Sequence, residues 1–168
     1  MSAVRSPAQA SRSVFVTLGE YLGPYKAHAD VTPQIIANAN DLLTRVNKVY
    51  ALYVADGGEL QTNPATGSVI SGSGNGGLRP RDAKVGAPNS THKDGQGIDT
   101  YDPKRSFASW CIEHFTTLAE NGLHMEDPRW TPTWVHLQSV PPRSGKTVYI
   151  PNASPALAAA PKKWEDMA

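Results

Sequence analysis

The chain has 168 residues, of which 39% are hydrophobic and 18% charged, and its formal net charge is +1. This length suits one domain with one modest core. The near-neutral charge excludes a bulk electrostatic attraction to nucleic acid or to an anionic membrane. The single cysteine, Cys111, excludes an intrachain disulfide framework and a cysteine-based zinc cluster.

The first residues, "MSAVRSPAQASRSVF", contain basic side chains but no apolar core of a signal peptide. No run of about 18 apolar residues predicts a membrane-inserted helix. We therefore expect a protein made in a bacterial cytoplasm, which something else must release if it acts outside. Residues 1–12 are expected to be disordered and residues 13–151 to form one domain. Residues 152–168 are expected to form an Ala/Pro-rich tail, in which Trp164 is suited to contact the body.

The clearest helix is predicted to begin at Thr32, a good N-cap, with Pro33 at the first helical position. Apolar residues then recur in steps of three and four, which indicates one buried face. They are Ile35, Ala39, Leu42, Val46, Val49 and Tyr53. The sequence "ADGG" (55–58) is expected to end this helix.

The later elements are shorter. Residues 68–71 suit a short strand, and the Gly- and Pro-rich loop that follows has the length typical of functional or disordered segments. A second helix is predicted from about Pro103 to Asn121. Two strands, 133–138 and 146–151, are expected to be joined in a hairpin-like way. Together the pattern predicts an α+β fold in which helices pack on a small antiparallel sheet.

His92, Asp99 and His136 stand out among the polar residues. His92 and Asp99 flank a glycine-containing bend, and His136 lies on one face of a predicted strand. Two histidines and one aspartate provide a three-ligand zinc site with a fourth position open. The alternative is a loop-bracing His92–Asp99 hydrogen bond with a solvent-facing His136. The other three histidines are interpreted as structural residues: His28, His114 and His124.

The segment "STHKDGQGID" (90–99) resembles the S-x-H-x-x-G-x-A-x-D signature of zinc D,D-carboxypeptidases and L-alanyl-D-glutamate endopeptidases, which belong to the hedgehog-like group. Upstream, "ISG" and "GGLRP" resemble the S-G-Y-R segment of that family. Downstream, "TWVH" resembles its W-x-H strand. The resemblance covers about residues 30–151 and implies a hedgehog/D-Ala-D-Ala metallopeptidase-like fold.

The resemblance also implies roles. His92, Asp99 and His136 would be the Zn²⁺ ligands. Arg79 would be the arginine that holds a substrate carboxylate or carbonyl, with Arg81 as the competing position.

The resemblance also implies roles for Ser90 and Gly97. The Ser90 hydroxyl would hydrogen-bond to a metal ligand or to the substrate, with a simple turn residue as the alternative. Gly97 replaces the usual alanine, a change expected to be tolerated in a bend. Independently of the resemblance, Trp130 and Trp134 are suited to stack on a sugar or a peptide stem, with core positions as the alternative.

One departure concerns the general base. Many family members place an acid three residues before the last ligand, or a histidine two before it. This chain has Thr133 and Trp134 there. Glu126 is the candidate base, provided that "DPRWTP" folds back. The weaker candidates are Asp127, Glu113 and His124.

The expected function is therefore that of a zinc metallopeptidase that cuts peptidoglycan stem peptides, with the minimal organisation of a bacteriophage endolysin. The alternative is a peptidase-fold protein without catalysis, acting as a virion or cell-wall-binding component. A nucleotide-binding interpretation of "RSGKT" (143–147) is disfavoured because Val140 occupies the first glycine position of that motif. The sequence indicates no oligomeric state.

Overall fold

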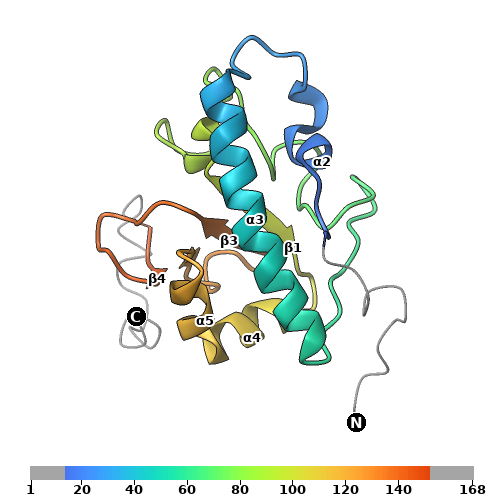
Figure 1. Cartoon of the computed structure of the whole chain (residues 1–168), viewed down its shortest axis with the longest axis vertical. Coiled ribbons are helices and arrows are strands. Elements are labelled where there is room, and N and C mark those ends of the chain that lie inside the picture. Colours follow the sequence, from blue (N-terminus) through green and yellow to red (C-terminus); the bar gives the residue numbers. More distant parts are fainter. Residues whose placement is uncertain (1–13, 152–168) are drawn as a thin grey trace.

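A long helix packed on one face of a small sheet organises the fold (Figure 1). The computed structural model describes residues 14–151. The expectations for residues 1–12 and for the tail at 152–168, with Trp164, lie outside the described residues.

Helix α3 spans Pro33–Ala55, as the sequence predicts. The Thr32 side chain accepts a hydrogen bond from the amide of Ile35 at 3.3 Å, which satisfies one amide of the first turn. The predicted face is buried, together with three neighbouring residues. The buried residues are Ile35, Ala39, Leu42, Leu43, Val46, Val49, Tyr50, Tyr53 and Val54.

The sheet has four strands in the order β1-β3-β2-β4. Their bounds are Gly97–Tyr101 (β1), His124–Glu126 (β2), Trp134–Gln138 (β3) and Val148–Tyr149 (β4). Strand β3 pairs antiparallel with β1 and β2, whereas β2 and β4 are parallel. The sheet is thus mixed, and the expectation of a purely antiparallel sheet is wrong.

The expected hairpin between residues 133–138 and 146–151 is also wrong. Strand β3 already has a neighbour on each edge, so β4 pairs with β2 instead. The connection after β3 therefore crosses past β2. The predicted strand at 68–71 is reduced to one isolated bridge, between Ile70 and Thr100.

Alternation along the strands divides the sheet into an apolar and a polar face. The apolar face is buried beside α3, where the Tyr50 hydroxyl lies 2.6 Å from the Thr100 hydroxyl. Its residues are Ile98, Thr100, Met125, Val135, Leu137 and Val148. The polar face is left for the site described below.

The predicted second helix is divided into α4 (Ser106–Glu113) and α5 (Phe115–Glu120), with non-helical backbone at His114. It begins later than Pro103 because Asp102 caps it from outside. The Asp102 carboxylate accepts from the amides of Phe107 (3.2 Å) and Ala108 (2.8 Å).

A short N-terminal helix, α2 (Leu18–Leu22), supports the loop that leads into the site. The Tyr21 hydroxyl donates to the carbonyl of Gly97 at 2.9 Å, and the Tyr21 carbonyl accepts from the amide of Leu78 at 3.0 Å. A Cβ on Gly77 would lie 2.1 Å from that same carbonyl. Only glycine therefore allows this close approach.

Candidate metal centre

Three separate elements deliver His92, Asp99 and His136 to one point. His92 lies in a short 3-10 helix, Thr91–Asp94, whose N-cap side chain is Ser90. Gly95 then turns the chain into β1 with a φ of +71°, and a Cβ there would lie 2.8 Å from the carbonyl of Ile35. Asp99 on β1 stands directly opposite His136 on β3. Local turn chemistry and strand register thus bring the three side chains together.

The three inner atoms form a nearly equilateral triangle. His92 Nε2 lies 3.2 Å from Asp99 Oδ1, His136 Nδ1 lies 2.9 Å from that oxygen, and the two nitrogens are 3.2 Å apart. An ion held tetrahedrally at about 2.0–2.1 Å from each ligand sets ligand atoms about 3.3 Å apart. All three residues are buried, with exposed fractions of 2%, 8% and 7%. The group can therefore bind a metal ion.

The outer nitrogens fix which atoms face inward. His92 Nδ1 lies 2.8 Å from the carbonyl of Gly77, which only accepts, so this nitrogen carries the proton. Gln138 donates from Nε2 to the carbonyl of Val140 at 2.7 Å, which turns its Oε1 toward His136 Nε2 at 3.2 Å. When both rings are neutral with their outer nitrogens protonated, both inner nitrogens present lone pairs beside a carboxylate oxygen. A set made only of acceptors suits a cation.

The guanidinium of Arg79, which was expected to hold a substrate carboxylate or carbonyl, contacts the Asp99 carboxylate. Its Nη2 donates to Asp99 Oδ2 at 3.0 Å and its Nε donates to the carbonyl of Asn75 at 2.6 Å. A Cβ on Gly86 would lie 2.6 Å from Nη1, so the loop before Ser90 approaches the guanidinium closely. Arg79 therefore orients Asp99 as part of the site's supporting shell.

A polar row crosses the whole sheet at the level of the site. Asp99 pairs with His136, and continuing the β2–β3 register by one residue sets Glu126 opposite His136. Glu126 in turn pairs with Tyr149 on β4. The loop 127–133 thus does fold back, which was the condition for Glu126 to reach the site.

The burial and the charges of the site shift its pKa values. Burial lowers the pKa of His92. Burial also opposes charge on His136, but the hydrogen bond and charge of Asp99 outweigh it and raise that pKa. For Asp99, burial raises the pKa, but the neighbouring His92 and His136 outweigh it, so its pKa lies well below the usual range. Burial raises the pKa of Glu126.

The triangle opens into a cleft of about 490 Å³, which we call the metal cleft. Four of the candidate residues beyond the ligands line it: Arg79, Ser90, Glu126 and Trp134. Arg81 is not among its lining residues. Its guanidinium is largely exposed and pairs with Asp94 at 3.1 Å.

Gly97 is placed differently from the expectation. It is the first residue of β1 rather than part of a bend. A Cβ there would lie 2.3 Å from Thr91 Oγ1 and 3.1 Å from His136 Cε1. Glycine at this position therefore makes room for the Thr91 hydroxyl beside the site.

The remaining candidates lie away from the triangle. Asp127 is fully buried and is bound by the guanidinium of Arg129. The ring of His114 stacks on Trp110, and His124 Nδ1 lies 2.9 Å from the carbonyl of Lys146. His28 Nδ1 accepts from the amide of Asp30 at 3.1 Å. These contacts agree with structural roles.

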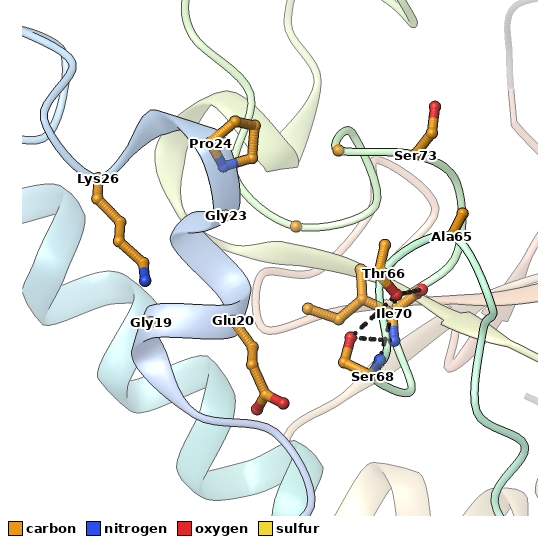
Figure 2. A pocket seen from close by; sticks show the side chains of 12 residues that line it. Gly19, Glu20, Gly23, Pro24, Lys26, Ala65, Thr66, Ser68, Ile70 and Ser73 are labelled. Carbon is orange, nitrogen blue, oxygen red and sulfur yellow. Dashed lines mark hydrogen bonds between the residues drawn. The ribbon is translucent and has the colours of Figure 1, made fainter.

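A separate hollow of about 380 Å³ lies between α2 and the loop 65–77, and we call it the Lys26 hollow (Figure 2). Figure 2 shows hydrogen bonds that join Thr66, Ser68 and Ile70 within one turn. The hydroxyls of Thr66 and Ser68 are therefore used by the loop itself. None of the residues His92, Asp99 and His136 lines this hollow.

Sequence reasoning did not assign roles to Gly77, Gln138 and Tyr149. The carbonyl of Gly77 and the side chain of Gln138 orient the two imidazoles, and the Tyr149 hydroxyl donates to Gln138 Oε1 at 2.7 Å. The alternation Trp134-x-His136-x-Gln138 in β3 is the signal that could have found Gln138, because alternate residues share a face. The contacts of Gly77 and Tyr149 arise only through the fold.

Comparison with known proteins adds no relative. No protein-family model, no curated protein and no solved structure matches the chain. Within residues 14–151, no helix has both the length and the apolar character needed to cross a membrane. The group His92–Asp99–His136, which could hold a metal ion, is therefore the feature from which a function has to be argued.

Proposed function

We propose that this protein is a zinc-dependent hydrolase of peptidoglycan stem peptides. The observation that carries the proposal is the triangle of His92 Nε2, Asp99 Oδ1 and His136 Nδ1, with separations of 2.9–3.2 Å. Two imidazoles and one carboxylate suit Zn²⁺ better than Mg²⁺ or Ca²⁺, which prefer oxygen ligands. Three protein ligands beside an open cleft are typical of catalytic zinc.

The substrate class rests on the resemblance of residues 90–99 to the zinc D,D-carboxypeptidases and L-alanyl-D-glutamate endopeptidases. The hedgehog-like fold, as the finer description of this α+β chain, is part of the same proposal. Two observations support this proposal. His92 and Asp99, at the two ends of the signature, contribute to one site. The W-x-H segment forms strand β3, which pairs with strand β1 that carries Asp99. A bacteriophage endolysin is the proposed biological setting.

Zinc with an open coordination position supplies Lewis acidity to a carbonyl and lowers the pKa of water. The Glu126 carboxylate, across the strand from His136, would accept a proton from the nucleophile and pass it to the leaving amine. Its raised pKa brings it closer to neutral pH, where a general base works best. Arg79 would hold Asp99 in the orientation needed for metal binding.

A second candidate is a protein that binds peptidoglycan without cutting it. Thr133 favours it, because an exposed threonine stands where many relatives of the resembled family carry the acid. The position of Glu126 favours the enzyme.

Digestion of purified peptidoglycan, with products identified by mass spectrometry, separates the two candidates. Zinc-loaded protein should release stem-peptide fragments, and chelator-treated protein should release none until zinc is restored. Binding without fragments at any pH, with zinc bound, would establish the non-catalytic candidate.

A further inference from the structure

The metal cleft continues into a second hollow on the same face of the sheet. This hollow has a volume of about 370 Å³, and we call it the Tyr101 hollow. Arg79, Asp99 and Trp134 line both spaces. The site therefore lies at the junction of two hollows, each within the ~300–1,000 Å³ typical of small-ligand pockets.

The strand register explains this arrangement. Tyr101 and Trp134 are paired across β1 and β3, two residues along from the Asp99–His136 pair. All four side chains lie on the polar face, because alternate residues of a strand share a face. The metal cleft extends the other way, toward Gln138 and Tyr149. An extended peptide thus has room on both sides of the metal-binding residues.

Among the described residues, the lining offers a terminal carboxylate no lysine or arginine that is free of an acidic partner. In the described part of the chain, Arg79 is the only lysine or arginine that lines either hollow. Its Nη2 is bound to Asp99 and its Nε to the carbonyl of Asn75. The other lining acid is Glu126, which would repel a carboxylate. Desolvating an unpaired carboxylate is costly, so a site that selects a chain end needs a cation to meet it.

Neutral polar groups line the Tyr101 hollow instead. The uncharged polar residues of its lining include Tyr101, Thr133 and Asn75. Asn63 uses its Nδ2 to brace the carbonyls of Ile70 (2.8 Å) and Gly72 (2.7 Å). Such a surface suits the backbone and uncharged side chains of a peptide that continues past the bond.

From these observations we infer that the site acts on internal bonds of an extended peptide, with substrate residues in both hollows, and not on the last residue of a chain. The inference rests on the proposed hydrolase function. A metal ion at the triangle would face the bond to be cut. If that bond preceded the last residue, the terminal carboxylate would lie one residue farther along and would need a cationic protein group as its partner. The described residues offer no unpaired lysine or arginine there.

The test uses defined muropeptides, with zinc-loaded full-length protein and mass spectrometry of the products. We expect fragments of two or more residues. We also expect kcat/KM for an end-blocked, extended peptide to be at least about 10-fold higher than for a peptide truncated to one residue with a free carboxylate after the bond. An amidated version of the truncated peptide separates the effect of charge from that of length. Release of a single C-terminal residue as the main product would overturn the inference.

Two variants locate the effect. Thr133→Trp should fill the Tyr101 hollow and raise KM for the extended peptide at least about 10-fold, without changing zinc content. Ala65→Trp, in the Lys26 hollow, is the matched control and should leave KM unchanged. An unchanged KM in Thr133→Trp would contradict occupation of the Tyr101 hollow.

If no peptide is cut, the proposed hydrolase function fails and binding decides the inference. The intrinsic tryptophan fluorescence of the zinc-loaded protein is then titrated with the same peptides. We expect binding of the extended, end-blocked peptide to be at least about 10-fold tighter than that of the truncated free acid. Equal or reversed affinities would overturn the inference.

Discussion

Replacing Glu126 with glutamine should lower activity and raise stability at the same time. The substitution keeps the size of the side chain, and the Glu126 carboxylate accepts no hydrogen bond within residues 14–151 that would be lost. As the proposed base, Glu126 should contribute about two to four orders of magnitude to the rate. At about 1.36 kcal/mol per tenfold, this loss corresponds to roughly 2.7–5.4 kcal/mol of transition-state stabilisation.

The effect on stability has the opposite sign. Burial raises the pKa of Glu126 above its ordinary value of 4.5. An acid whose pKa rises on folding destabilises the folded state once the pH exceeds its unfolded pKa. At pH 7 the ionised Glu126 should therefore cost stability in the metal-free protein, and Glu126→Gln should relieve that cost. Most substitutions destabilise, so a gain here would be specific to this cause.

The assay pairs kcat/KM on stem peptides with urea denaturation in the presence of a chelator. At pH 7 the variant should unfold at a higher urea concentration than the wild type, and the difference should shrink as the pH falls toward 4. Glu113→Gln, on the exposed side of α4, is the control and should change neither quantity. Hydrolysis by Glu126→Gln at the wild-type rate, with zinc bound, would refute the assignment of the base.

Three further predictions test the metal centre and its support. Saturating zinc, at about 100 times its Kd, should stabilise the wild type by about 2.7 kcal/mol, which corresponds to a rise in Tm of roughly 5–11 °C. Calorimetry should show no such rise for His92→Ala or His136→Ala. A full rise in either variant would contradict the ligand assignment. Gly97→Ala should lower the free energy of unfolding by roughly 1–3 kcal/mol through overpacking. Adding Thr91→Ala in a double-mutant cycle should recover part of this loss. Purely additive effects would exclude the contact between the two positions. Asp102→Ala should lower the free energy of unfolding, measured by urea denaturation, by roughly 1–3 kcal/mol, because two buried amides at the start of α4 lose their acceptor. Its zinc content should stay unchanged. Wild-type stability in this variant would show that the cap is dispensable.

The parts of the fold that could be predicted are those specified by local pattern. Helix α3 has an N-cap, a proline at its first position and a long apolar period, so its bounds follow from the sequence. Strand β3 alternates apolar and polar residues from Val135 to Gln138. By contrast, β2 has three residues and β4 has two, too few for a period to appear. Their parallel pairing depends on contacts between distant segments, which the local pattern does not encode.

The site divides in the same way. The ligands His92, Asp99 and His136 could be selected from residue type and the resembled signature. The role of Arg79 could not, because its binding to Asp99 depends on how the loop 72–79 folds over β1. Gly97 shows a similar limit. A glycine is needed there because of the neighbouring Thr91 side chain and not because of the backbone angle of a bend.

The zinc content of the purified protein tests the central claim most directly. Elemental analysis by mass spectrometry, after expression with sufficient zinc and removal of loosely bound ions, should give about one zinc per chain for the wild type. The same measurement should give a ratio close to zero for His136→Ala. A ratio near zero for the folded wild type would contradict the proposed zinc centre, and with it the zinc-dependent hydrolase.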